Sequence, residues 1–141
     1  ATFGEPEVKF GAGIVVMLLP WIVGPKKAKE IAFLGRDQIN AREACDLGIV
    51  NQVVPDEEVL SLAMEMARAI AVVDPMVMQR TKQQINETME IAGIDTALKR
   101  ALEIDLELEG EGSLDKQAFL EELRMGGLRG ALAWRDNRFR A

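Results

Sequence analysis

The 141-residue sequence predicts an α/β chain that is mostly helical, with short strands confined to its front part. Hydrophobic residues make up 48% of the chain and charged residues 28%, which is the balance of a folded globular protein. Residues 49–54 are rich in β-branched apolar side chains and are closed by Pro55, a pattern typical of a strand. From Asp56 onward, apolar residues recur at steps of three and four, the period of helices with one buried face.

Ahead of this strand, glycine and proline mark the ends of the expected elements. A turn is predicted over residues 4–7, because Pro6 disfavours the helical conformation at the residue before it. The apolar run over 14–19 fits a buried helix and a strand equally well. Helices are predicted over 25–35 and 41–47, since a proline begins the first and a glycine follows or ends each of them.

The rest of the chain is predicted to form helices. Asp56 and Asp74 are suitable N-cap residues, and Pro75 follows the second of them at the first helical position. Residues 103–109 alternate with period two, as a strand would, but leucines at steps of four residues favour a helix. The expected helices cover residues 57–72, 75–91, 95 onward, 113–125 and 128–136. Because two short strands cannot form a stable sheet, we expect the front strand to pair with a segment outside this chain.

The composition excludes several classes of function. With 17 Lys and Arg residues against 23 Asp and Glu, the net charge is −6, which argues against broad electrostatic binding to nucleic acid. The absence of histidine excludes a Ser-His-Asp triad and a histidine metal site within the chain, and Cys45 alone cannot form an internal disulfide. Neither a signal-peptide pattern nor an apolar run long enough to cross a membrane is visible, so we expect a cytoplasmic protein.

An ordered series of short motifs runs through the chain. It comprises Phe3-Gly4-x-Pro6-Glu7 with Gly11, Leu19-Pro20-x-x-Val23-Gly24, Gly48-Ile49-Val50, Val53-Val54-Pro55, and finally Arg135 and Phe139. This series resembles the second half of the enoyl-CoA hydratase/isomerase (crotonase) family. The resemblance implies the end of a spiral of ββα turns over residues 1–55, followed over 56–141 by a helical region for trimerisation and for closing the substrate pocket. It also implies that the N-terminal half of the fold lies outside this chain.

The resemblance further implies an enzyme that acts on acyl-CoA thioesters, adding water to a 2-enoyl double bond or shifting that bond. Glu7 falls on a catalytic glutamate of the family and would be the general acid/base. Gly11, Arg135 and Phe139 would contact the substrate. No metal is implied, and no cofactor other than the coenzyme A of the substrate; the assembly would be a homotrimer or a hexamer. The N-terminal half would supply a second glutamate and the oxyanion hole, whose two N–H groups hold the thioester oxygen.

Other interpretations stay open at this point. Taken alone, Glu7 would be an exposed turn residue, as most glutamates are, and Glu5 stands at a variable position of the motif and is interpreted as a turn residue. Residues 12–16 are more apolar than the Pro-Gly-x-Gly-Gly-Thr run of many hydratases, so hydratase, isomerase, dehydratase and thioester hydrolase chemistry all remain open. The 141-residue chain by itself, without an oxyanion hole, would be a non-catalytic helical oligomerisation module.

Overall fold

The computed structural model describes residues 1–14 and 17–140, and most of them are helical. The predicted run over 14–19 therefore lies partly outside the described residues. In chain order the elements are β1 (Thr2–Phe3), the 3-10 helix η1 (Glu7–Phe10), α1 (Leu19–Phe33), β2 (Ile39–Asn40), α2 (Ala41–Asp46), the 3-10 helix η2 (Asp56–Glu58), α3 (Val59–Ala71), α4 (Pro75–Ile91), α5 (Ile94–Glu111) and α6 (Leu114–Arg138). The prediction of a mostly helical chain with short strands at its front is confirmed.

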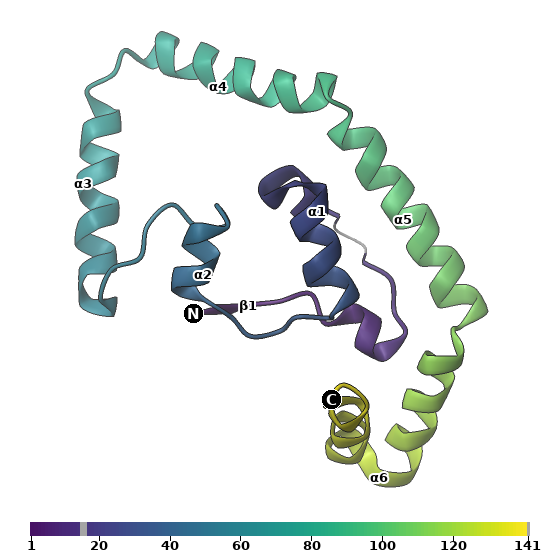
Figure 1. Ribbon diagram of the computed structural model, residues 1–141. Coiled ribbons are helices and arrows are strands. Elements are labelled where there is room, and N and C mark those ends of the chain that lie inside the picture. The colour runs from purple at the N-terminus through teal and green to yellow at the C-terminus, as the bar shows by residue number, and fades with distance from the viewer. Residues whose placement is uncertain (15–16, 141) are drawn as a thin grey trace.

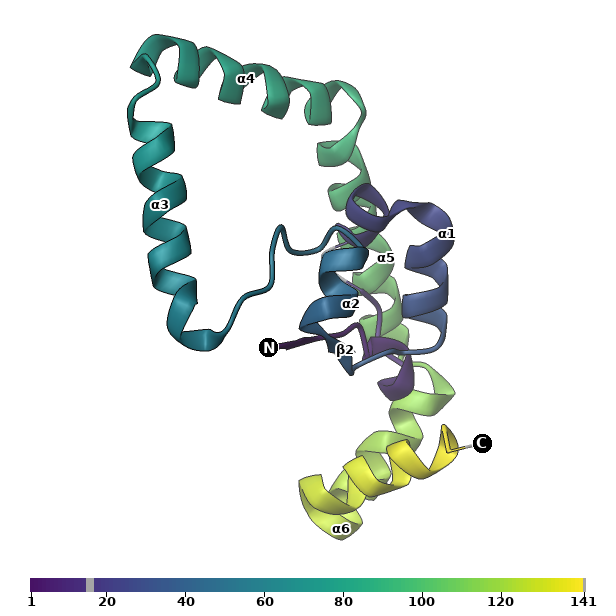
Figure 2. The same cartoon turned by 60° about the vertical axis from the view of Figure 1, so that its left-hand side comes forward.

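The helices do not pack into one compact body. In Figure 1, α3, α4 and α5 follow one another in an arc around α1 and α2, and α6 folds back beneath them. Figure 2 shows α3 and α4 standing apart from the centre of the molecule. The accessible surface is 10361 Å², against about 7,250 Å² for a compact monomer of this mass. Much apolar surface that a compact domain would bury is therefore exposed on α3 to α6.

A small core lies where the front strands meet α1 and α2. Ile31, Ile39 and Ala44 are its fully buried residues, with 0–1% of their surface exposed. Strand β1 pairs antiparallel with β2, so that Phe3 lies opposite Ile39 and packs on this core. The front strand thus finds a partner within the chain, although each strand is only two residues long.

The strand predicted over residues 49–54 is wrong. This segment is an irregular connection between α2 and η2. Its first two N–H groups, of Ile49 and Val50, donate to the carbonyl of Ala44 at 2.8 and 3.3 Å and so finish α2. Ile49 and Val50 are partly buried against the core, but no strand among the described residues lies beside the segment to form a sheet with it.

The helix signals were more accurate than the strand signal. The Asp74 carboxylate accepts hydrogen bonds from the N–H groups of Met76 and Val77, and α4 begins at Pro75 as predicted. Residues 103–109 are helical within α5, as the four-residue spacing of the leucines predicted, and not a strand as the period-two alternation would indicate. At Gly127 the backbone turns to φ +63° and ψ −174°, which bends α6 at the predicted break. None of the helices described here is long and apolar enough to cross a membrane.

Helix α1 begins earlier than predicted, at Leu19, and bends at Gly24. Gly24 has φ +77° and ψ +158°, a conformation that glycine adopts without strain. The predicted helix from Pro25 is the second arm of α1. Its end is joined to α2 by two parallel hydrogen bonds from the Arg36 guanidinium to the Glu43 carboxylate, at 2.7 and 2.9 Å.

The turn after β1 lies directly against the connection that follows α1. The N–H of Glu5 donates to the carbonyl of Arg36 at 2.7 Å. A Cβ atom at Gly4 would lie 2.4 Å from the Cα of Asp37 and 2.8 Å from the Arg36 oxygen. Only glycine allows this approach, so Gly4 fixes where the following residues Glu5 and Glu7 are placed.

Replacing Gly4 by alanine is expected to lower the free energy of unfolding by about 1–3 kcal/mol, because backbone must move to make room. Denaturant unfolding of the native protein, expressed from its complete coding sequence, measures this loss. The matched control is Gly110→Ala, at an exposed helical position with open space around it, where alanine should be neutral or stabilising by up to about 1 kcal/mol. Equal stability of both variants would show that the close approach is absent.

Candidate active site

Glu7 is the first residue of η1, and its carboxyl group points into the protein. The Oε2 atom is buried and has no hydrogen-bond partner among the described residues. A buried, unpartnered carboxylate oxygen costs free energy, and a catalytic role or a bound water or ion are the explanations such groups have in folded proteins. This observation favours a functional Glu7 over an exposed turn residue.

Glu5 is more than the turn residue that its variable position indicated. Burial, the charge of Glu7 and a hydrogen bond with the Glu7 side chain together raise the pKa of Glu5 to about 7, from an ordinary value of 4.5. The sequence held a signal for this pair, since a Glu-Pro-Glu turn places two carboxyl groups on either side of a rigid residue. What the sequence did not reveal is the burial, which depends on α1.

The surroundings of Glu5 are apolar. A cavity of about 240 Å³ lies between Glu5 and α1, with apolar walls and Lys29 at its edge. A second cavity, of about 470 Å³, runs from Glu5 past Leu18 and Ile22 to the core. In such surroundings an ionised carboxyl group loses much of its hydration, which favours its neutral form.

Gly11 closes η1 and meets the start of α6. Its φ is +69°, and its carbonyl accepts a hydrogen bond from the Ser113 hydroxyl at 2.8 Å. A Cβ at this position would lie 2.2 Å from the Ser113 oxygen and 2.6 Å from the Lys116 nitrogen. Gly11 therefore makes the junction between η1 and α6, while its predicted contact with substrate stays a prediction.

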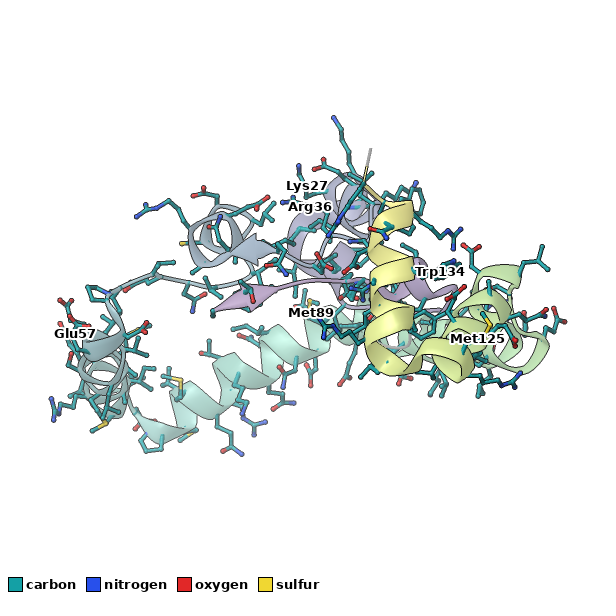
Figure 3. The ribbon with its side chains drawn as sticks, turned by 90° about the horizontal axis from the view of Figure 1, so that it is seen from below. Lys27, Arg36, Glu57, Met89, Met125 and Trp134 are labelled. Carbon is teal, nitrogen blue, oxygen red and sulfur yellow. The ribbon has the colours of Figure 1, made fainter. Side chains whose placement is uncertain are left out.

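The other two predicted site residues come from the end of the chain and also reach η1. The Arg135 guanidinium lies 4.7 Å from the centre of the Phe10 ring and pairs with Asp136. The Phe139 ring lies 5.7 Å from the ammonium of Lys9. Figure 3 shows Trp134 on the C-terminal arm of α6; Arg135 is the next residue of this arm, and Phe139 follows its end. Glu7 and Gly11 at the two ends of η1, and Arg135 and Phe139 across from it, thus gather around one short element.

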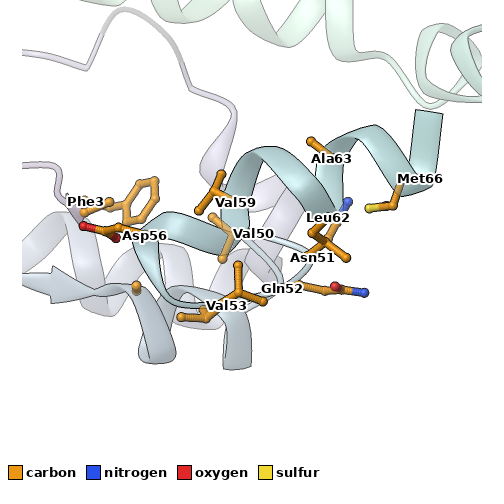
Figure 4. Close-up of a pocket in the computed structure, with 13 residues that line it drawn as sticks. Phe3, Val50, Asn51, Gln52, Val53, Asp56, Val59, Leu62, Ala63 and Met66 are labelled. Carbon is orange, nitrogen blue, oxygen red and sulfur yellow. The ribbon is translucent and has the colours of Figure 1, made fainter. Parts of the chain in front are cut away.

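The hollow between α3 and the connection before it does not belong to this group. It has a volume of about 330 Å³ and is lined mostly by apolar side chains, with Phe3, Val53 and Met66 among them (Figure 4). None of the four predicted site residues lines it. Within the described residues no group of three or more acidic or cysteine side chains is placed to hold a metal ion.

Comparison with known proteins shows close relatives of this chain. The sequence model of the family described as "Enoyl-CoA hydratase/isomerase" matches residues 1–124. The "Crotonyl-CoA hydratase" of Syntrophomonas wolfei is 36% identical over 115 residues, or 78% of this chain. The "Short-chain-enoyl-CoA hydratase" of Clostridium acetobutylicum is 39% identical over 103 residues, or 70% of this chain. The crystal structure of an enoyl-CoA hydratase/isomerase from Xanthobacter autotrophicus Py2 matches 100% of the chain with a TM-score of 0.92 and 56% identity.

These matches cover only part of each relative. The matched regions are 41% and 38% of the two curated hydratases, and this chain covers 52% of the Xanthobacter structure. The chain therefore spans about half or less of the length of the proteins it matches. The family model nevertheless covers most of this chain. The fold of the chain also agrees with the Xanthobacter structure from the first residue of the chain to the last. The chain belongs to the enoyl-CoA hydratase/isomerase family.

Proposed function

We propose that this chain is the C-terminal half of an enzyme that adds water to the double bond of a 2-enoyl-CoA thioester, or shifts that bond. The observation that supports this most directly is the buried, unpartnered Oε2 of Glu7, at the position of the family's catalytic glutamate. The names of the curated relatives point to short-chain enoyl thioesters as the first substrates to test.

Hydration requires three events. A water loses a proton to a base as its oxygen bonds to C3, the electron pair of the double bond moves toward the thioester oxygen, and C2 gains a proton. Glu7 would accept the proton of the water, because its Oε2 has a lone pair that no neighbour among the described residues uses. A bond shift needs only removal and return of a proton, which one carboxylate can perform. The groups that hold the thioester oxygen would come from the N-terminal half of the fold, which this proposal places outside the 141 residues.

Gly11, Arg135 and Phe139 are proposed to contact the substrate near η1. The planar guanidinium of Arg135 suits a phosphate group of coenzyme A. It is held in place by Phe10 and by Asp136, whose carboxylate accepts from the Arg135 Nε at 2.7 Å. No metal or separate cofactor enters this proposal.

We propose further that the apolar faces of α3 to α6 are covered by neighbouring subunits in a homotrimer or hexamer. Their exposure in the single chain supports this, with Leu60 73% exposed and Ile91 87% exposed. Large exposed apolar surfaces on a folded protein are typical of sites that contact another molecule, and a second subunit is the partner proposed here.

The test offers a 2-enoyl-CoA and a 3-enoyl-CoA of four carbons to the native protein in deuterated water, with products analysed by mass spectrometry. Hydration adds one water to the 2-enoyl substrate, and a bond shift gives the isomeric thioester, which carries deuterium wherever the carboxyl proton exchanges with solvent before its return. The 141-residue chain alone is assayed in parallel and should be inactive, since loss of even one oxyanion donor costs ~10²–10³ in rate. Failure of the native protein to convert either thioester would overturn the proposal and favour a non-catalytic assembly module.

A further inference from the structure

The end of η1 is joined to the start of α6 by one side-chain hydrogen bond. The hydroxyl of Ser113, the N-cap residue of α6, donates to the carbonyl of Gly11 at 2.8 Å and so connects residues 102 positions apart. The same oxygen accepts from the N–H of Lys116 at 3.1 Å and therefore caps α6 as well. One hydroxyl can serve both elements because it is a donor and an acceptor at once.

A second contact between η1 and α6 is made by aromatic rings. The rings of Phe10 and Phe119 meet edge to face with 5.1 Å between their centres, an arrangement that aromatic pairs favour. The Phe119 ring also lies 6.4 Å from Trp134, which comes from the other arm of α6. The two arms are joined to each other, because the Arg138 guanidinium donates to the Asp115 carboxylate at 2.8 Å. Both arms of α6 therefore take part in holding η1.

The placement of Glu7 depends on these contacts. A 3-10 helix has three residues per turn, so Glu7 and Phe10 lie on the same side of η1, one turn apart. The carbonyl of Glu7 accepts from the N–H of Ala12 at 3.1 Å, which links the backbone of Glu7 to the residue that follows Gly11. The Oε2 atom of Glu7 has no hydrogen-bond partner among the described residues. Its position is therefore set by the backbone and the packing of η1.

We propose that Ser113 and Phe119 are positioning residues, which hold η1 so that the Glu7 carboxylate is placed for proton transfer. The inference rests on the proposed function, in which Glu7 is the general acid/base. Proton transfer depends steeply on geometry, and a displacement of about 1 Å can cost on the order of 10²-fold in rate. Ser113 and Phe119 act through η1, by their contacts with Gly11 and Phe10, and not on the substrate itself.

The experiment measures kcat and KM of the native protein and its Ser113 variants with the thioester that the native protein converts. An aspartate keeps the N-cap of α6 but cannot donate to the Gly11 carbonyl, whereas a threonine keeps both bonds. Ser113→Asp should lower kcat roughly tenfold, the rate equivalent of one hydrogen bond, with KM little changed. Ser113→Thr should keep the native kcat. So should the control Ser61→Ala, which removes a hydroxyl bonded to the Glu58 carbonyl at 2.8 Å.

Phe119→Leu tests the aromatic contact separately. Leucine keeps an apolar side chain at this place but has no ring edge to present to Phe10, so kcat should fall about threefold with KM little changed. Phe33→Leu is the matched control, because the Phe33 ring of α1 is 72% exposed and makes no ring pair within the described residues. It should have the native kcat.

Hydrogen–deuterium exchange gives a readout that needs no substrate. If the Ser113 hydroxyl holds η1, the peptide that covers residues 7–12 should exchange faster in Ser113→Asp than in the native protein. Exchange within α4, which has no contact with η1, should be unchanged. Equal exchange of residues 7–12 in the two proteins would overturn the inference.

Two kinetic results would also overturn it. One is a native kcat in both Ser113→Asp and Phe119→Leu. The other is a rise in KM with kcat unchanged, which would assign Ser113 to substrate binding through Gly11. Glu7→Gln separates this failure from failure of the proposed function: if Glu7→Gln is inactive while the Ser113 and Phe119 variants keep the native kcat, the function stands and the positioning role falls. A native protein that converts neither thioester would overturn the proposed function, and the positioning role with it.

Discussion

Glu7→Gln is expected to abolish turnover of the enoyl thioester by the native enzyme, with kcat lowered by at least roughly 10²–10⁴-fold. Glutamine has nearly the same shape as glutamate but cannot accept a proton from water at neutral pH. Glu7→Gln impairs the proton-transfer step and not the binding of the thioester, so kcat should fall far more than KM rises. Steady-state kinetics with a short-chain 2-enoyl-CoA measures both.

The Glu7→Gln variant should remain folded, so its loss of activity can be assigned to the missing carboxylate. The Oε2 of Glu7 is buried without a partner, so the carboxylate stabilises the fold little in its present place. Removing the charge should leave the melting temperature unchanged or raise it, as is common where a site trades stability for activity. Glu57→Gln, at an exposed glutamate of η2, is the control for loss of one surface carboxylate. Native activity in a folded Glu7→Gln enzyme would exclude Glu7 as the general acid/base.

An element of the fold could be predicted where the sequence pattern acts on neighbouring residues, and could not where it depends on distant parts of the chain. Helix α4 begins where the Asp74-Pro75 pair indicated, because an N-cap and a proline act on their immediate neighbours. The strand predicted over 49–54 failed because a strand is stable only with a partner, and pairing depends on distant parts of the chain. Ile49 and Val50 still pack, partly buried, against the core, whereas Val53 is 42% exposed.

In the candidate site, too, local sequence patterns predicted some features and long-range packing determined the others. The position of Glu7 followed from the family motif, and the structure adds that its carboxyl oxygen is buried. The importance of Glu5 could not be predicted, since its burial comes from α1 and from the connection through Arg36, about thirty residues later in the chain. The approach of Arg135 to Phe10 joins residues from opposite ends of the sequence, which no local pattern encodes.

Helix α3 carries the apolar side chains on which the proposed subunit assembly can be tested most directly. Successive residues of a helix are 100° apart, so Val59 and Met66 lie on one face and Leu60 and Met64 on the adjoining face. All four side chains are more than two-fifths exposed. A helix that is apolar over adjoining faces is stable in water when both are covered. The connection before η2 reaches only the face with Val59 and Met66, so the face with Leu60 and Met64 is available to a partner.

Leu60→Glu is therefore expected to weaken assembly of the native protein by more than about 100-fold in the subunit dissociation constant. Burying an unpaired carboxylate costs several kcal/mol, and every 1.4 kcal/mol corresponds to about tenfold in affinity. Native mass spectrometry across a dilution series should show the trimer or hexamer for the unchanged protein and smaller species for the variant. Arg68→Glu, which places the same acid on the polar side of α3, should keep the native mass. An intact oligomer of Leu60→Glu at the lowest concentrations would show that this face of α3 is not in a subunit interface.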